Sequence, residues 1–179
     1  LLTNPLTIKL SLVAIMLASL YPFMKRYTHL PQLALGAAFS WSIPMAFAAE
    51  RNELPAALWL VYLANLTWTV AYDTFYAMVD REDDVLIGVK STAILFGRHE
   101  RAITACLQAV VIVLLLLTGR QFGLGTIYYL GVAAAALLFA HQQYLIRKRE
   151  RPDCFKAFLD NNRVGAAIFV GIALDYLLR

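Results

Sequence analysis

The sequence predicts an all-α, polytopic transmembrane helix bundle that forms a single membrane-embedded domain over residues 1–179. Of its 179 residues, 60% are apolar and only 16% are charged, and the mean hydropathy is +0.62. Soluble domains average about 45–50% apolar and about 25% charged residues, so this chain has too few polar side chains to cover a water-facing surface. Long apolar stretches also alternate with short basic segments. This composition excludes a soluble globule, a disordered chain and a disulfide-stabilised scaffold.

Six apolar stretches are predicted to be transmembrane helices, because about 20 apolar residues in a helix span about 30 Å of hydrocarbon. Pro44 lies inside the second stretch and predicts a kink there. Asp175 lies inside the last stretch, which is also short. The six stretches cover residues 6–23, 31–49, 55–79, 102–119, 124–146 and 163–178. Turn-forming residues separate them at Tyr21-Pro22, Leu30-Pro31, Glu50 to Pro55, Gly119 to Gly125 and Arg151-Pro152.

Lysine and arginine residues are distributed unevenly between the two ends of this bundle. Of the 16, 12 fall on one side and 4 on the other. Positive charge is retained on the cytoplasmic face, so loops 24–30, 80–101 and 147–162 are predicted to be cytoplasmic and both termini to lie on the far side. The cytoplasmic set is Lys25, Arg26, Arg81, Lys90, Arg98, Arg101, Arg147, Lys148, Arg149, Arg151, Lys156 and Arg163, and the other set is Lys9, Arg51, Arg120 and Arg179.

The net charge of +4 therefore indicates topology, and we expect no nucleic-acid partner. The basic cluster Arg147 to Arg151 is expected to meet anionic lipid headgroups.

The first apolar stretch lacks a small-residue cleavage site, so we expect no signal peptide. Because the chain starts without Met, we also do not expect a complete reading frame. Cys106 and Cys154 have no metal-binding or disulfide pattern and are expected to be packing residues.

An acidic cluster follows the third apolar stretch. Asp73, Asp80 and Asp84 are seven and four residues apart, which places them on one face of a helix. Asp73 lies within the apolar stretch, where an ionised carboxylate is unfavourable unless it meets water, a cation or a partner. Three like charges would also raise one another's pKa values unless a cation lies between them. The arrangement indicates a cation site at the mouth of this helix.

Oxygen ligands without histidine favour Mg²⁺ or Ca²⁺, and Mg²⁺ often shares its coordination shell with substrate phosphates. A lipid diphosphate site is therefore one hypothesis. Lys25 and Arg26 in the first cytoplasmic loop could bind the diphosphate or an acidic acceptor, although any cytoplasmic loop carries such a pair for orientation. Other interpretations are a solvated helix end paired with Arg81, an ion path in a cation transporter or channel, and a membrane scaffold in which the aspartates are incidental.

Three stretches closely resemble UbiA-type intramembrane prenyltransferases: residues 21–32, 41–44 and 72–92. The similarity is specific from about Tyr21 to Gly97, and it extends toward the C-terminus through Cys154 to Phe158 and Asn161-Asn162. The nearest likeness is to members that prenylate 4-hydroxybenzoate in ubiquinone synthesis. The resemblance implies a nine-helix fold in a bacterial inner membrane, with an active site that faces the cytoplasm and binds prenyl diphosphate through Mg²⁺.

The resemblance also assigns roles to individual residues. Tyr21 and Lys25 match a Tyr-x-x-x-Lys motif, and Asp80 and Asp84 match the second Asp-x-x-x-Asp motif. Arg26 and Asp73 occupy positions that resemble functional residues. The expected Mg²⁺ ligands are Asp80 and Asp84, with Asp73 as a ligand or as an orienting residue. The expected catalytic residues are Arg26, Lys25 and Asp73, and the expected substrate-binding residues are Tyr21, Lys25, Arg26, Tyr76 and Lys90.

The implied reaction is Mg²⁺-assisted loss of diphosphate from a polyprenyl diphosphate, followed by attack of the acceptor ring carbon ortho to the phenol. Arg26 could act on the diphosphate or on the acceptor carboxylate. Naphthoate, homogentisate and haem are alternative acceptors within the family. Trp68, Tyr72, Phe75 and Tyr76 could line an isoprenoid groove or could simply pack between helices. Protein partners are unknown from the sequence.

One family feature is absent from these 179 residues: the first Asp-rich motif, Asn-Asp-x-x-Asp-x-x-x-Asp. Only six of the nine expected helices are present, and the missing three are expected before Leu1. We therefore expect this chain to correspond to the C-terminal two-thirds of such an enzyme. With half a metal site, it is expected to be inactive alone.

Overall fold

The computed structural model describes residues 3–178, and all regular secondary structure within that range is helical. This confirms the predicted all-α class. The α-helices are α1 (Pro5–Tyr27), α2 (Pro31–Ser40), α3 (Ser42–Arg51), α4 (Leu58–Leu86), α5 (Thr92–Phe96), α6 (Glu100–Gln121), α7 (Thr126–Leu145), α8 (Arg151–Leu159) and α9 (Asn161–Leu177). Two 3₁₀ turns, η1 (Gly97–His99) and η2 (Ile146–Lys148), complete the fold.

Within residues 3–178, five helical stretches are long and apolar enough to cross a membrane: Pro5–Tyr27, Pro31–Arg51, Thr92–Gln121, Thr126–Lys148 and Arg151–Leu177. The sixth predicted stretch corresponds to α4, which has 29 residues but is not in this set. Polar residues such as Asn65 and Asp73 lower its hydropathy, while its Thr69 and Thr74 side chains are buried against other helices. A helix that is surrounded by protein does not need a lipid-like surface.

Helix α1 starts at a well-formed cap and runs further than predicted. The Asn4 side chain accepts a hydrogen bond from the backbone N–H of Thr7 (2.9 Å), and Pro5 supplies a favourable first residue. The predicted break at Tyr21-Pro22 is wrong, because the helix continues through Pro22 to Tyr27. Pro22 lacks the N–H that would bond to the Ala18 carbonyl, but this single missing bond does not end the helix.

The second apolar stretch is interrupted near the predicted kink. Helix α2 ends at Ser40 and α3 begins at Ser42, so the break falls at Trp41, three residues before Pro44. Pro44 then occupies the first turn of α3, where a missing N–H is tolerated. The Trp41 indole donates to the Leu10 carbonyl of α1 (3.0 Å), which fixes the interrupted helix against its neighbour.

The two long cytoplasmic loops of the sequence prediction are largely helical, so their description as loops is wrong. Helix α4 extends to Leu86, and the remainder of 80–101 contains α5 and η1. Most of 147–162 is the helix α8. Hydropathy alone misplaces these ends, because a helix can continue beyond the apolar layer when its polar residues are solvated and its ends are capped.

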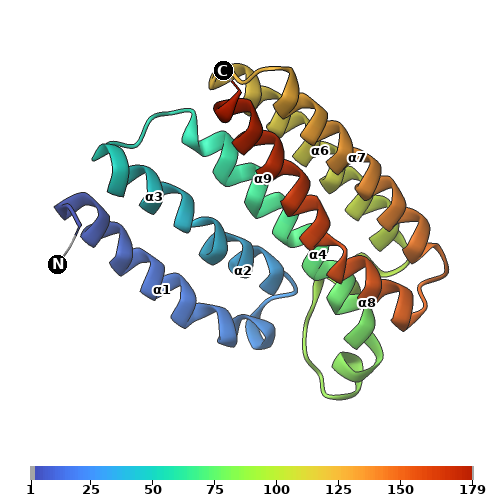
Figure 1. Ribbon diagram of the computed structural model, residues 1–179. Helices are drawn as coiled ribbons and strands as arrows, with labels where there is room; N and C mark the ends of the chain where they lie inside the picture. Colours follow the sequence, from blue (N-terminus) through green and yellow to red (C-terminus); the bar gives the residue numbers. More distant parts are fainter. Residues whose placement is uncertain (1–2, 179) are drawn as a thin grey trace.

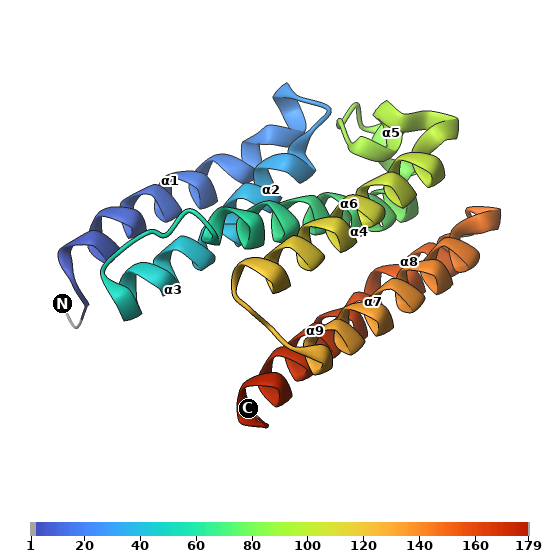
Figure 2. The ribbon, with the colours of Figure 1, turned by 90° about the horizontal axis from the view of Figure 1, so that it is seen from above.

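Helix α4 lies at the centre of the molecule and packs against α2, α6 and α8 (Figure 1). Helices α1 to α3 lie on one side of it, and α7 to α9 form a group on the other side (Figure 2). One apolar core joins α4, α6, α7 and α9 and includes Tyr128 and Val164. A second core surrounds Phe75 and Met78 where α4 meets α5, η2 and α8.

The start of α1 and the end of α9 lie at the same end of the bundle as the α6–α7 connection, whereas α5 lies at the opposite end (Figures 1 and 2). This arrangement matches six alternating crossings of a membrane, with segments 28–30, 87–99 and 146–150 at the α5 end. These segments belong to the regions predicted to be basic. Of the residues used in the charge count, Arg179 lies outside the described part of the chain.

Candidate functional site

A cavity of about 820 Å³ lies between α1, α2, α4 and the α8–α9 junction. This volume is within the range of about 300–1,000 Å³ that is usual for small-molecule sites. Its walls are largely apolar, with a few polar groups. The lining includes Tyr21 of α1, Trp68, Tyr72 and Asp73 of α4, Phe158 of α8 and Asn161 of α9.

The Asp73 carboxylate marks the polar end of this cavity. Its charged and polar neighbours are Lys25, Gln32 and Asp80. The Lys25 charge acts on Asp84 as well as on Asp73, so one ammonium group from α1 serves two carboxylates of α4. Tyr21, one helical turn before Lys25, also lies within electrostatic range of Asp73. The structure therefore brings together both residues of the predicted Tyr-x-x-x-Lys motif and the predicted acidic face.

The segment after α4 folds back over the ends of α1 and α2. The backbone N–H of Lys90 donates to the Lys25 carbonyl (3.0 Å), and the Lys90 Nζ donates to the Tyr27 carbonyl (3.3 Å). The Thr92 N–H donates to Gln32 Oε1 (3.1 Å). These bonds place the backbone of Lys90 beside that of Lys25.

Asp84 lies beyond the apolar part of α4 and is buried, with 6% of its surface exposed. Burial raises the pKa of the Asp84 carboxyl, the Lys25 charge opposes this shift, and Asp80 adds to it. Its Oδ2 atom is buried and has no hydrogen-bond partner within the described residues. An unpartnered buried carboxylate oxygen beside a second carboxylate is suited to a hard cation.

The three aspartates do not form a complete metal cage. Within residues 3–178, no group of three or more His, Cys, Asp or Glu side chains is close enough together to hold a metal ion. Asp80 and Asp84 could therefore supply only part of the coordination of a divalent cation, and water and phosphate oxygens would have to supply the remaining ligands. Asp73 has Lys25 and Gln32 as neighbours and does not complete a three-carboxylate group with Asp80 and Asp84.

Of the five residues with predicted substrate-binding roles, Tyr21 lines the cavity, whereas Lys25, Arg26, Tyr76 and Lys90 do not. Arg26 is exposed. Tyr76 packs against Phe158, with ring centroids 5.1 Å apart. Phe75 is fully buried in the second core, so for this residue the packing interpretation is confirmed.

Aromatic side chains form one wall of the cavity. The Trp68 indole donates to Asn161 Oδ1 (2.8 Å), and Asn161 in turn donates to the Ala157 and Phe158 carbonyls (3.0 Å each). The Trp68 and Tyr72 rings meet edge to face with centroids 6.1 Å apart, and Tyr72 lies 6.0 Å from Phe158. This network fixes the wall on the side of α8 and α9.

Sequence reasoning assigned no role to Gln32, Asn65 or Asn161. Gln32 is 2% exposed and joins Asp73 to the backbone of Thr92. Asn65 lines the cavity and donates to Ser40 Oγ (3.0 Å). For Gln32 and Asn65 the available signal was an amide side chain within an apolar stretch, where a polar group needs a partner, whereas Asn161 lies in a predicted loop and gave no such signal.

The comparisons with known proteins agree with this geometry. A model of the UbiA prenyltransferase family matches residues 1–169. The chain belongs to the UbiA prenyltransferase family. Family membership confirms the resemblance that residues 21–32 and 72–92 carry.

Its relatives include proteins named 4-hydroxybenzoate octaprenyltransferase. The one from Saccharophagus degradans is 62% identical over 99% of this chain and 60% of its own length, and the one from Sodalis glossinidius is 64% identical over 97% and 60%. The chain thus spans about 60% of the length of these relatives.

Solved structures share the fold of this UbiA-family chain. The apo structure of a UbiA homologue from Aeropyrum pernix matches with a TM-score of 0.83 and 25% identity, over 98% of this chain and 66% of that one. A digeranylgeranylglyceryl phosphate synthase structure matches with a TM-score of 0.74 and 19% identity, over 94% and 62%. The membrane-embedded helical fold is therefore shared with both proteins.

Proposed function

We propose that the complete protein transfers a polyprenyl group from a polyprenyl diphosphate to the ring of 4-hydroxybenzoate, a step of ubiquinone synthesis. The observation that carries this proposal is that the Lys25 charge acts on both Asp73, which lines a large, aromatic-walled cavity, and Asp84, the buried acid further along α4. The names of relatives about 60% identical to the chain support the choice of substrates. Family membership favours this reaction over the ion path of a transporter.

The polar end of the cavity is suited to a diphosphate group. The backbones of Lys25 and Lys90 are hydrogen-bonded to each other, and the two ammonium groups would contact diphosphate oxygens. Asp80 and Asp84 would hold Mg²⁺, which when bound neutralises charge on the leaving diphosphate. Asp73 and Gln32 would orient the Lys25 ammonium toward the same group. Together these residues would stabilise the diphosphate as its bond to the prenyl carbon breaks.

The apolar part of the cavity is suited to the prenyl chain and the acceptor ring. Trp68, Tyr72 and Phe158 offer aromatic faces to an allylic cation, and their packing excludes water that would otherwise capture it. The amide groups of Asn65 and Asn162 also line the cavity and are available to hydrogen-bond an aromatic acceptor that carries oxygen substituents. Arg26, which is exposed outside the cavity, would guide anionic substrates toward its mouth.

The test uses a chimera in which this chain is joined to the part of the Saccharophagus degradans relative that it does not cover. We expect the chimera to prenylate 4-hydroxybenzoate in membranes, and this chain alone to be inactive because it lacks the first Asp-rich motif. The double substitution Asp80→Asn and Asp84→Asn should lower transfer by at least about 100-fold, since loss of charge stabilisation at a leaving group has effects of this size.

The matched control is Asp83→Asn, which changes an exposed acid on a different face of the same helical turn. We expect this variant to retain most of its activity. Full transfer by the Asp80 and Asp84 double variant would refute the proposed assignment of the diphosphate site. If Asp83→Asn lowers prenyl transfer as much as the double substitution does, the total negative charge of this helical turn matters and the individual positions of Asp80 and Asp84 do not.

We also propose that the protein resides in a bacterial inner membrane with the polar end of the cavity toward the cytoplasm. The basic segments 24–30, 80–101 and 147–162 support this orientation. Donor and acceptor would then meet at the cytoplasmic leaflet, with the prenyl chain extending toward the bilayer interior.

A further inference from the structure

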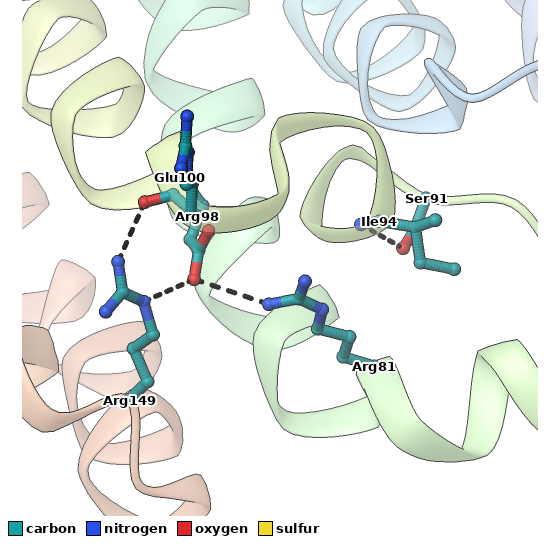
Figure 3. A network of polar contacts seen from close by, with 6 residues as sticks. All are labelled: Arg81, Ser91, Ile94, Arg98, Glu100 and Arg149. Atoms are coloured by element: carbon teal, nitrogen blue, oxygen red, sulfur yellow. Dashed lines mark hydrogen bonds and ion pairs between the residues drawn. The ribbon is translucent and has the colours of Figure 1, made fainter.

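Glu100, the first residue of α6, is a buried acid that lies outside the cavity. Its side chain is 0% exposed, and its Oε1 atom accepts from Arg149 Nε (2.6 Å) and lies 3.5 Å from Arg81 Nη1 (Figure 3). The Arg149 Nη2 atom also donates to the Arg98 carbonyl (2.8 Å). One carboxylate therefore joins three segments: the end of α4, the η1–α6 junction and the η2–α8 junction.

The backbone of Arg149 gives a second, independent indication that this contact is important. Its φ of 59° lies in the left-handed region, which a long side chain rarely adopts. Glycine would suit this position better as far as the backbone is concerned. Arg149 adopts this conformation where η2 ends, and its guanidinium there bridges Glu100 and the Arg98 carbonyl.

The network lies at one end of the segment that covers the diphosphate end of the site. Segment 87–99 is held at its start by bonds of Lys90 and Thr92 to α1 and α2. At its other end it is held by Glu100 and by the Arg98 carbonyl. Arg81 directly follows Asp80, so the same carboxylate also restrains the turn of α4 that carries the acidic motif.

A neighbouring pair of contacts reinforces this restraint. Arg151 of α8 pairs with Glu82 (3.0 Å) and Asp83 (3.3 Å) of α4. These two acids are exposed, so their ion pairs contribute little. Glu100 differs, because removing a partner from a fully buried ion leaves an uncompensated charge. Of these contacts, the Glu100 network is the one able to fix the geometry.

We infer that Glu100 is a positioning residue: through Arg149 and Arg81 it holds segment 87–99 and the end of α4 so that Lys90 and Asp84 face the donor diphosphate. This inference rests on the proposed function. It assigns Glu100 no contact with either substrate, and it predicts that disturbing Glu100 affects the donor more than the acceptor.

The test is Glu100→Gln in the chimera, because glutamine keeps the shape of the side chain and removes its charge. We expect the KM for polyprenyl diphosphate to rise about tenfold, as is usual for residues that support a metal site indirectly, while the KM for 4-hydroxybenzoate changes less than about twofold. Hydrogen–deuterium exchange of the peptide that covers 87–99 should become faster, with no change in the α7 and α9 peptides. This second measurement does not depend on activity.

The matched control is Glu53→Gln, which removes an exposed ion pair with Arg51 at the other end of the bundle. It should change neither KM value nor exchange in 87–99. Arg149→Lys keeps the charge but lacks the fork that spans Glu100 and the Arg98 carbonyl, so it should show a smaller shift in the same direction. If Glu100→Gln fails to fold, Arg149→Lys is the variant that tests the inference.

An unchanged exchange rate in 87–99, or an equal rise in both KM values, would overturn the inference. Absence of transfer in the unsubstituted chimera would instead refute the proposed function. Normal transfer with an unshifted donor KM in both Glu100→Gln and Arg149→Lys would refute only the positioning role of Glu100.

Discussion

A single acidic residue within an apolar stretch is easily recognised in the sequence as unusual. Its hydrogen-bond partner can be recognised only in the folded structure. Asp175 is an example, because its charge weakened the prediction of the last transmembrane helix. In the structure it is 3% exposed, and its Oδ2 atom accepts from the backbone N–H of Gly125 (2.9 Å), the residue before α7. The two residues are 50 positions apart, and no local pattern links them. The carboxylate satisfies an N–H at a helix start, where negative charge is favourable.

Replacing Asp175 should destabilise the junction between α9 and α7. We expect Asp175→Leu to lower the free energy of unfolding by about 1–3 kcal/mol, because the Gly125 N–H loses its buried acceptor. Asp175→Asn keeps an acceptor oxygen and should have a smaller effect. Unfolding in detergent, followed by circular dichroism during dodecyl sulfate titration, measures both variants. Equal stability of Asp175→Leu and the unsubstituted chain would contradict this role.

At the scale of helices, the apolar stretches were located correctly because the thickness of a bilayer sets their length. Their ends were less accurate, since capping and the packing of polar turns decide where a helix stops. Helix contacts were not predictable at all. Helices α7 and α9 cross where Gly131 meets Gly171, and a Cβ added to Gly131 would lie 2.8 Å from the Ala167 carbonyl oxygen and 3.0 Å from the Gly171 Cα. Nothing in the sequence pairs these two glycines.

The close approach of α7 and α9 predicts that bulk is not tolerated at Gly131. We expect Gly131→Leu to destabilise the bundle by about 1–3 kcal/mol, because the backbones must move apart. The matched control is Leu130→Phe, which adds bulk at a neighbouring side chain that is 64% exposed. Thermal unfolding in detergent compares the two. A stability loss of the same size in both variants would show that the crossing is not tightly packed.

At the scale of the whole molecule, the site is assembled from elements that are far apart in the sequence. Helical periodicity predicts that Asp73, Asp80 and Asp84 share a face. It does not predict that the charge of Lys25, 48 residues before Asp73, acts on both Asp73 and Asp84, and here the family resemblance supplied what periodicity could not. Neither helical periodicity nor the family resemblance indicated the residues that hold the site residues in place. These are Gln32, which contacts Asp73, and Glu100, which holds one end of segment 87–99. Such residues are recognised only when the fold shows a buried polar group with distant partners.

The asymmetry of basic residues makes a prediction about the orientation of the entire bundle. In a background with Cys106→Ser and Cys154→Ala, single cysteines are placed at exposed positions near the two ends. His29→Cys and Lys148→Cys report on the end near Lys25, and Glu53→Cys and Gln121→Cys report on the other end.

In intact spheroplasts, a membrane-impermeant maleimide should label only the cysteines at positions 53 and 121, because 12 of the 16 basic residues lie at the opposite end and keep it in the cytoplasm. After lysis, all four should react. The background without an added cysteine provides the control and should not react in either state. Labelling of positions 29 and 148 from outside would show that the bundle has the opposite orientation. The proposed diphosphate site would then lie on the wrong side of the membrane for a cytoplasmic donor. Labelling of one position from each pair would contradict the six crossings themselves, because each pair lies at one end of the same bundle.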